Sequence, residues 1–219
     1  MDFRDSTRHQ GLRKRLTDGL KIKGIQNQDV LDAIAKVPRH LFIDSSFIDF
    51  AYKDQAFPIG AGQTISQPYT VAYQTSLLQI IPNDKILEVG TGSGYQAAIL
   101  LEMKAKVYTI ERQRELYLKA QQLLPQLGYF PNFFYGDGYK GLPTYGPFDK
   151  IIVTAGAPVV PEELKQQLKI GGRMVIPLGP LEKQVMCVLI RTSKDEFKKE
   201  TYGDFLFVPM LKGVENNYS

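Results

Sequence analysis

The stretch Lys85-Ile86-Leu87-Glu88-Val89-Gly90-Thr91-Gly92-Ser93-Gly94-Tyr95 decides the fold of this 219-residue chain. Its apolar first half predicts a strand, Ile86 to Val89, and its second half predicts a glycine-rich turn that opens a helix, Tyr95 to Met103. Backbone N–H groups and the positive end of the helix dipole then face the edge of the sheet. The glycines of the turn let a ligand approach the backbone closely, because they lack a Cβ atom.

Acidic residues end three consecutive predicted strands. Glu88 belongs to the first strand, Glu111 ends the second, and Asp137 follows the third. A carboxylate after the second strand can accept hydrogen bonds from both hydroxyls of a ribose, and one after the third could accept the exocyclic amine of an adenine. The chain is therefore predicted to bind a nucleoside-containing cofactor.

The spacing of the glycines favours one class of cofactor. Dinucleotide sites usually read G-x-G-x-x-G, which seats a pyrophosphate on the helix N-terminus. This chain reads G-x-G-x-G, with Glu88 two residues before Gly90. That carboxylate would repel a pyrophosphate but suits the cationic, amino-acid-bearing end of S-adenosylmethionine. Two alternatives stay open: a dinucleotide-dependent oxidoreductase, and an unrelated α/β protein with a tight turn and two solvated acids.

Length and composition are those of an ordinary globular protein. We expect a single domain over residues 1–219, with residues 1–82 as a helical and loop extension and residues 83–219 as the cofactor-binding α/β core. No apolar run of about 18 residues predicts a membrane span, and the charged beginning of the chain lacks the apolar core of a secretory signal. Cys187 stands alone in an apolar run, as expected of an inert buried thiol. These features predict a cytoplasmic protein, and we expect a monomer.

The net charge of +4 arises in the first 23 residues, which hold seven Lys or Arg and three Asp. A basic arm of this kind could bind nucleic acid. Its charges, however, alternate with Leu12, Leu16 and Leu20 at helical spacing and are not interleaved with stacking aromatic residues. The pattern favours the solvated face of an amphipathic helix, and no nucleic-acid partner is predicted.

The order of the predicted elements indicates a doubly wound α/β sheet. The first 38 residues predict two helices, residues 39–68 lack a regular pattern, and Pro68 begins a helix that runs to about Ile81. Strands and helices then alternate, which implies a mostly parallel sheet with right-handed crossovers. The runs 184–191 and 202–209 predict an antiparallel edge. The alternating elements are strands 85–90, 106–111, 132–136, 149–154 and 172–177, and helices 94–103, 113–127 and 161–168.

The sequence offers few groups for acid–base or metal chemistry. It holds two histidines, His9 and His40, and one cysteine, without clustered ligand spacing, so no metal site is predicted. No G-x-S-x-G nucleophile elbow occurs, and a structural role at a helix end is favoured for His40. These exclusions favour a reaction that needs little acid–base help, such as methyl transfer from a sulfonium to an ionised oxygen.

Ser66 is the sharpest single candidate for a catalytic residue. It lies between a glycine-rich segment and the helix that Pro68 begins. Its hydroxyl could cap that helix, or it could donate a hydrogen bond to an anionic substrate at the helix N-terminus. The residues alone leave both interpretations open.

Several blocks of the sequence resemble the protein-L-isoaspartate (D-aspartate) O-methyltransferase family, and together they span about residues 37 to 209. The block Thr64 to Pro68 is the most specific, because the glycine strand occurs in methyltransferases broadly. The resemblance implies a Rossmann-like methyltransferase fold. It also implies S-adenosylmethionine-dependent methylation of the α-carboxylate of L-isoaspartyl and D-aspartyl residues in damaged peptides and proteins. The matching blocks are Val37–Phe42, Ala51–Asp54, Pro58–Pro68, Glu88–Ala98, Thr109–Arg112, Gly136–Gly138, Pro147–Ala155, Gly171–Gly179 and Phe207–Pro209.

The same resemblance implies roles for individual residues. Ser66 matches the family's active-site serine, oriented toward the substrate carboxylate, and Ile65, Ser66 and Val208 would contact the substrate peptide. Combined with the glycine turn and the acidic strand ends, it predicts a set of cofactor-binding residues. These are Thr64, Ile65, Glu88, Gly90, Gly92, Gly94, Glu111, Asp137 and Gly138.

The chain departs from the family pattern in three places. Ala61 falls where relatives often carry a larger residue, Thr154-Ala155-Gly156 differs by a glycine, and the tail 210–219 diverges, so no cofactor contact is predicted in it. Two other functions stay open: a methyltransferase that acts on a small molecule or nucleic acid, and a non-catalytic nucleoside-binding module. Amino methylation of nucleic acid often uses an Asn/Asp-Pro-Pro-aromatic strand end, and none follows strand 149–154.

Overall fold

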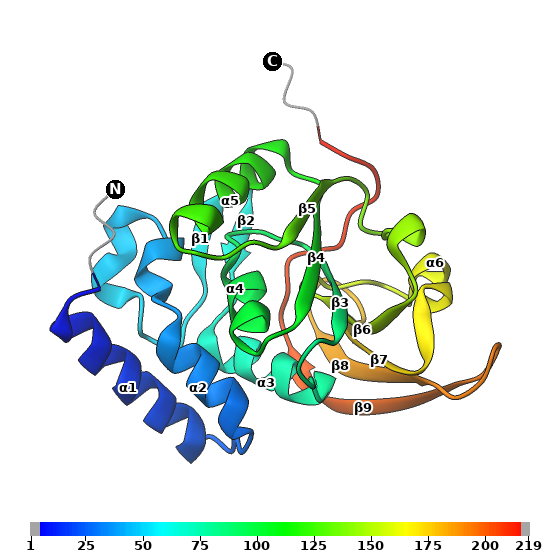
Figure 1. Cartoon of the computed structure of the whole chain (residues 1–219), viewed down its shortest axis with the longest axis horizontal. Coiled ribbons are helices and arrows are strands. Elements are labelled where there is room, and N and C mark those ends of the chain that lie inside the picture. The colour runs from blue at the N-terminus through cyan, green and yellow to red at the C-terminus, as the bar shows by residue number, and fades with distance from the viewer. Residues whose placement is uncertain (1–4, 216–219) are drawn as a thin grey trace.

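A seven-stranded sheet forms the centre of the molecule (Figure 1). The computed structural model describes residues 5–215; the first four residues and the last four, which include the end of the divergent tail, lie outside the described part. The strand order is β5-β4-β3-β6-β7-β8-β9, in which β3 to β7 pair in parallel and β8 and β9 are antiparallel. The predicted α/β fold, with a mostly parallel sheet and an antiparallel edge, is confirmed.

The sheet is flanked by six α-helices and three short 3-10 helices among the described residues. The helices are α1 (Thr7–Ile22), α2 (Gln28–Lys36), α3 (Pro68–Leu78), α4 (Tyr95–Glu102), α5 (Arg114–Gln126) and α6 (Glu162–Gln166), with η1 (Arg39–Phe42), η2 (Ser45–Phe50) and η3 (Pro143–Tyr145). The strands are β1 (Phe57–Gly60), β2 (Gln63–Ile65), β3 (Lys85–Val89), β4 (Lys106–Glu111), β5 (Asn132–Tyr135), β6 (Phe148–Val153), β7 (Leu168–Leu178), β8 (Gln184–Arg191) and β9 (Phe197–Phe205).

Two hydrophobic clusters lie on the two faces of the sheet. Helices α3, α4 and α5 cover one face, and α1 and α2 pack outside them (Figure 1). Helix α6 and the loop around η3 cover the other face. Because alternate residues of a strand point to opposite faces, Ile86 joins the first cluster and Leu87 the second. The central strands are therefore buried on both sides, as is typical of parallel sheets.

Residues 39–68 are more regular than the sequence predicts. They contain η1, η2 and the antiparallel hairpin of β1 and β2. Gly60, Ala61 and Gly62 close the hairpin with φ angles of 99°, 50° and 66°, a left-handed backbone that glycine adopts readily. The strands hold only four and three residues, which is too short for a periodic pattern to be visible.

Several predicted boundaries were wrong. The last strand spans Phe197–Phe205 instead of 202–209, because its polar first half pairs with β8 at the exposed edge of the sheet. Helix α3 ends at Leu78, since Gln79 takes a left-handed φ of 52°. Helix α6 is limited to Glu162–Gln166, and β7 begins at Leu168, four residues before the predicted start.

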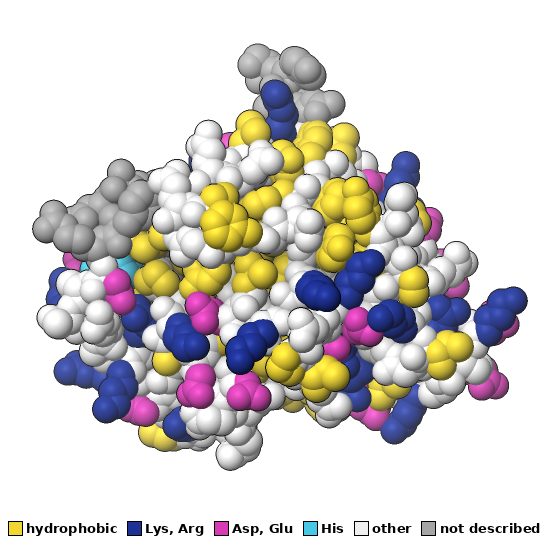
Figure 2. Space-filling view, in the orientation of Figure 1, with side chains coloured by type: hydrophobic (Ala, Val, Ile, Leu, Met, Phe, Trp, Pro, Cys, Tyr) yellow, Lys and Arg dark blue, Asp and Glu magenta, His cyan; other side chains and the backbone are white. Residues whose placement is uncertain are grey.

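Helix α1 packs as its leucine spacing predicts, with Leu16 and Leu20 buried. One of its basic residues is an exception to the predicted solvated face. Arg13 is 6% exposed, and its guanidinium forms an ion pair with Asp5 at 2.8 Å and donates to the hydroxyl of Tyr52 at 3.2 Å. In the face that Figure 2 shows, Lys and Arg side chains over α1 and α2 are interspersed with Asp and Glu. Cys187 is buried, as predicted.

Candidate active site

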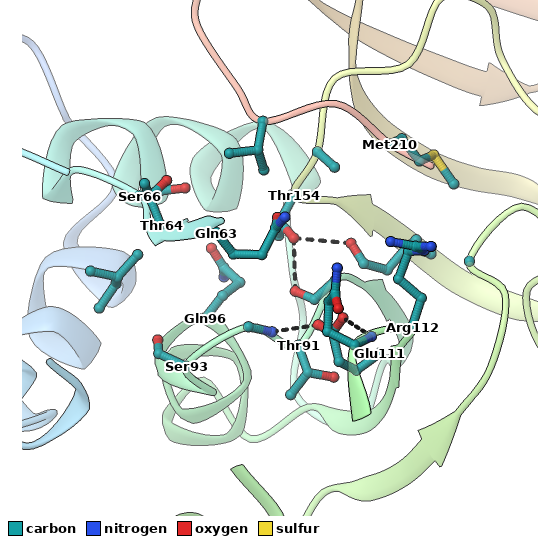
Figure 3. A pocket seen from close by; sticks show the side chains of 18 of the residues that line it. Gln63, Thr64, Ser66, Thr91, Ser93, Gln96, Glu111, Arg112, Thr154 and Met210 are labelled. Carbon is teal, nitrogen blue, oxygen red and sulfur yellow. Dashed lines mark hydrogen bonds between the residues drawn. The ribbon is translucent and has the colours of Figure 1, made fainter. Parts of the chain in front are cut away.

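A cavity opens at the carboxyl ends of the parallel strands, where the glycine turn, the β2–α3 junction and the chain after β9 meet (Figure 3). Its empty space, about 900 Å³ when the part open to solvent is included, is lined by both polar and apolar residues. Of the predicted site residues, eight lie in its wall. The eight are Thr64, Ile65, Ser66, Gly90, Gly92, Glu111, Gly138 and Val208.

The glycine turn between β3 and α4 is held in place by Thr154, which follows β6, and packs against Leu124 of α5. Gly90, Gly92 and Gly94 have φ angles of 97°, 51° and 85°. A Cβ at Gly90 would collide with Oγ1 of Thr154, which donates to the carbonyl oxygens of Val89 and Gly90 at 3.0 and 2.8 Å. A Cβ at Gly94 would lie 2.8 Å from Leu124 in the core. Gly94 is therefore required for packing, and it does not line the cavity, contrary to its predicted ligand contact.

Glu111 ties the turn to the end of β4. Its carboxylate is 6% exposed and accepts hydrogen bonds from the backbone N–H of Gly92 at 2.9 Å and of Gln113 at 2.8 Å. Each carboxylate oxygen keeps a further lone pair for a donor in the cavity. Two adjacent hydroxyls, such as those of a ribose, provide donors of this kind.

Glu88 does not reach the cavity, so the predicted contact between its carboxylate and the cationic end of a ligand is wrong. Its position in β3 points the side chain toward the face of the sheet that α3, α4 and α5 cover, and Glu88 is fully buried there. The hydroxyl of Thr109 donates to Glu88 Oε2 at 2.5 Å, and Thr91 Oγ1 lies 2.6 Å from Thr109 Oγ1. Burial raises the pKa of Glu88 to about 8, so the carboxyl group is mostly neutral at pH 7.

The chain after β9 closes the end of the cavity near Gly138. Asp137 precedes Gly138 and is not itself in the cavity wall; the N–H groups of Tyr139 and Gly213 donate to its carboxylate at 2.9 Å. Met210 and Leu211 line the cavity. Met210 is held there by hydrogen bonds with Gly156 and with the hydroxyl of Tyr139, at 2.8 and 3.2 Å. Tail residues thus contribute to a site in which the sequence predicts none.

Ser66 lies where the cavity meets a second, outer cleft between α3 and β9. Its hydroxyl has no hydrogen-bond partner among the described residues, whereas its main-chain oxygen accepts from Arg39 at 2.8 Å. The N-terminus of α3 is capped by Asp54, whose carboxylate accepts from the N–H of Tyr69 at 2.7 Å. The capping interpretation of Ser66 is therefore wrong, and its hydroxyl is left to interact with a ligand.

The outer cleft is built to hold a longer molecule than the cavity alone. Thr64, Ser66, Thr154 and Val208 line both spaces. Beyond them, an aromatic wall continues to the surface, with ring centroids 5.4 to 6.5 Å apart in Tyr69, Tyr73 and Phe205. The main-chain oxygen of Val208 already accepts from the N–H of Gly156 at 2.8 Å. A substrate chain in this cleft would place one side group beside Ser66.

The two histidines meet in the fold, away from the cavity. One ligand atom each of Asp5, His9 and His40 lies within 4.8 Å of the others, a proximity that the sequence spacing does not indicate. Both carboxylate oxygens of Asp5 bind the Arg13 guanidinium at 2.8 and 3.0 Å, and Nδ1 of His40 lies 2.7 Å from the hydroxyl of Tyr52. The cluster joins α1 to η1, which agrees with the structural role favoured for His40.

Fold and site together define a methyltransferase of the Rossmann-like class, with a glycine turn and a carboxylate at the end of the second parallel strand. The family model described as protein-L-isoaspartate(D-aspartate) O-methyltransferase matches residues 11–215. The chain therefore belongs to the protein-L-isoaspartate (D-aspartate) O-methyltransferase family. A relative from Flavobacterium johnsoniae, named protein-L-isoaspartate O-methyltransferase, is 59% identical over 96% of this chain and 99% of its own length.

Solved structures lead to the same family. One, named protein-L-isoaspartate O-methyltransferase, has a TM-score of 0.81 at 28% identity and covers 90% of this chain and 65% of its own. Another is described as a putative enzyme of that name from Plasmodium falciparum in complex with S-adenosyl-L-homocysteine. It has a TM-score of 0.79 at 27% identity and covers 91% of this chain and 98% of its own.

The sequence does not predict several polar residues of the cavity wall, and three of them lie on separate segments. Gln74 lies on α3, Gln96 on the first turn of α4, and Thr154 after β6. Thr154 was noticed only as a departure from the family pattern. Gln96 lies two residues after Gly94, and this position near a helix N-terminus is the one sequence signal that indicates it.

Proposed function

We propose that this chain methylates the α-carboxylate of L-isoaspartyl and D-aspartyl residues in damaged peptides and proteins, with S-adenosylmethionine as the methyl donor. The resulting ester is expected to close spontaneously to a succinimide, which reopens in part to a normal aspartyl residue. Family membership and the geometry of the cavity both support the proposal. Among the described residues, no helix is both long and apolar enough to cross a membrane.

The observation that carries the proposal is the position of the Ser66 hydroxyl. It has no partner within the described protein, and Ser66 lines both the cavity and the outer cleft. A small cofactor would occupy the cavity beside the glycine turn, and an extended polypeptide would occupy the aromatic-walled outer cleft. The two ligands must meet where the methyl group passes from the sulfur to the substrate carboxylate, and this carboxylate would lie beside Ser66.

The residues of the cavity fit the donor in charge and shape. Gly90 and Gly92 line the cavity without side chains, Glu111 would offer acceptors to the ribose, and Gly138 and Met210 would enclose the adenine end. When bound, S-adenosylmethionine supplies an electrophilic methyl group on a positively charged sulfur. The chain itself needs no general base, because a substrate carboxylate is already ionised at neutral pH.

Ser66 would hold the substrate carboxylate in the productive orientation. Its hydroxyl can donate to one carboxylate oxygen and leave the other free to attack the methyl carbon as the carbon–sulfur bond breaks. A neutral donor is suited to this task, because a stronger cationic partner would make the oxygen a poorer nucleophile. Thr154 and Val208, which line both spaces, would exclude water from the reacting atoms.

A radiolabel assay tests the proposal directly. The chain is incubated with S-adenosylmethionine labelled in the methyl group and either an isoaspartyl peptide, a D-aspartyl peptide or their normal aspartyl twin. We expect base-labile label on the first two peptides and none on the twin. Equal labelling of all three, or label only on a small-molecule or nucleic-acid acceptor, would refute the proposed substrate.

A binding experiment separates the cofactor from the substrate. Titration calorimetry with S-adenosylhomocysteine is expected to give tight binding, and the same titration with NAD no heat of binding. Tight binding of NAD without a response to S-adenosylhomocysteine would instead favour the oxidoreductase alternative. Binding of S-adenosylhomocysteine without methyl transfer to any acceptor would favour the non-catalytic module.

A further inference from the structure

Gln96 carries an unpaired acceptor in the wall of the cofactor cavity. The residue lies in the first turn of α4, is 7% exposed and faces the cavity from the side of Ser66 (Figure 3). Its amide oxygen, Oε1, is buried and has no hydrogen-bond partner among the described residues. Most buried polar atoms in proteins are paired, so an unpaired acceptor beside a ligand cavity indicates a donor on the ligand.

The neighbouring hydrogen bonds fix which end of the amide faces the ligand. The hydroxyl of Thr75 donates to the main-chain oxygen of Val71 at 2.7 Å, which uses its single proton. Thr75 Oγ1 can therefore only accept from the Gln96 side chain, 3.0 Å away. The amide NH₂ group must point to Thr75, and Oε1 is the end that remains for the cavity. The assignment thus follows from the hydrogen-bond network.

Gln96 is also at the appropriate end of the cavity. With the proposed cofactor, Glu111 and Gly138 would lie at the nucleoside end of the cavity and Ser66 beside the methyl group. The part of the cofactor beyond the sulfur is an amino acid, whose ammonium group has three donors and no acceptor. Glu88, the carboxylate that the sequence offers for this ammonium group, is buried outside the cavity.

From this arrangement we infer that Gln96 Oε1 accepts a hydrogen bond from the ammonium group of the bound cofactor and so fixes its amino-acid end. The inference rests on the proposed use of S-adenosylmethionine. A neutral acceptor is suited to this position, because a carboxylate beside a sulfonium would stabilise the charge that methyl transfer removes. Gln96 would thereby position the donor without reducing its reactivity.

The experiment compares two ligands on one variant. Gln96→Met keeps the length of the side chain and removes the acceptor. S-Adenosylhomocysteine has the amino-acid end, whereas 5′-methylthioadenosine has the same nucleoside thioether without it. In titration calorimetry, we expect Gln96→Met to weaken S-adenosylhomocysteine about 10- to 100-fold, the range for a hydrogen bond to a charged group. Its affinity for 5′-methylthioadenosine should stay within about twofold.

Two outcomes would overturn the inference. If Gln96→Met binds both ligands more weakly, Gln96 only maintains the shape of the cavity. If its affinity for neither ligand falls, the oxygen of Gln96 does not contact the cofactor. Gln121→Met, the same change on the exposed face of α5, is the matched control and should alter neither affinity. A wild-type chain that binds neither ligand would refute the proposed cofactor itself, and this result is distinct from both.

A second measurement avoids dependence on the folding of the Gln96 variant. Wild type is titrated with S-adenosylhomocysteine and with its deaminated analogue, and Thr75→Val is titrated with the same pair. We expect the wild type to bind the deaminated analogue about 10- to 100-fold more weakly than S-adenosylhomocysteine. In Thr75→Val the amide is free to turn, so the difference in affinity between the two ligands should be much smaller. An equal loss in both proteins would overturn the role of the fixed amide oxygen.

Discussion

The guanidinium of Arg39 donates a hydrogen bond to the main-chain oxygen of Ser66 at 2.8 Å. Arg39 is fully buried and also donates to the carbonyl oxygens of Ala51 and Gln55 at 3.1 and 3.3 Å. Its guanidinium lies 4.9 Å from the centroid of the Tyr95 ring, in the first turn of α4. One buried cation thus joins η1, the segment before β1, and the backbone of the candidate catalytic serine.

Arg39→Lys should destabilise the fold and displace Ser66. A lysine ammonium cannot reach all three carbonyl oxygens, which lie on two segments, and each buried acceptor left unpaired costs about 1–3 kcal/mol. We expect the free energy of unfolding to fall by about 2–4 kcal/mol and methyl transfer to slow at least tenfold. Urea unfolding and single-turnover rates measure the two effects. Arg8→Lys, at an exposed ion pair with Asp49, is the control; equal stability of both variants would contradict the role of Arg39.

Ser66→Ala should impair catalysis without affecting the fold. Its hydroxyl has no partner within the described protein, so the free energy of unfolding should change by less than about 0.5 kcal/mol. The single-turnover rate should fall about a hundredfold, because the substrate carboxylate loses its fixed orientation. Asp54→Ala removes the cap of α3 and should show the opposite pattern, with about 1 kcal/mol of lost stability. A normal rate in Ser66→Ala would exclude the proposed catalytic role.

Glu111→Ala should weaken the binding of both S-adenosylhomocysteine and 5′-methylthioadenosine. If its carboxylate binds the ribose, S-adenosylhomocysteine and 5′-methylthioadenosine should each lose about 1.5–3 kcal/mol of binding free energy. The variant should also lose about 1–3 kcal/mol of stability, since the N–H groups of Gly92 and Gln113 lose their acceptor. This pattern differs from that of Gln96→Met, which should spare the smaller ligand. Unchanged affinities in a folded variant would exclude Glu111 as the ribose ligand.

The fold could be predicted from the sequence where its cause is local. An apolar run followed by glycines predicts both the strand that ends at Val89 and the turn at Gly90. Strand β9 could not be delimited, because Phe197 to Thr201 carry a polar pattern that becomes a strand only through pairing with β8. The hairpin of β1 and β2 was also hidden, since its strands are too short to show a period.

The sequence also predicts the site residues whose position depends on a single segment, but not those that depend on contacts between elements. Ser66 and Glu111 lie at the ends of segments, where position in the chain fixes proximity to the cavity. Glu88 lies one residue before the last of its strand, where the alternation of side chains decides between cavity and core, and the sequence does not show which face the helices cover. The role of Gln96 depends on Thr75, which lies on another helix, so no local pattern could indicate it.

Glu88→Gln should change how stability depends on pH. Burial raises the pKa of Glu88 to about 8 in the folded protein, whereas an unfolded glutamate has a pKa of about 4.3. Between these values the unfolded chain releases a proton that the folded chain keeps, so stability falls as the pH rises, by up to about 1.4 kcal/mol per pH unit. Urea unfolding at pH 5, 6, 7 and 8 should give a smaller decline for Glu88→Gln, which cannot ionise, than for wild type. The variant should therefore gain relative stability toward pH 8, and parallel curves for the two proteins would show that Glu88 is ionised in the fold.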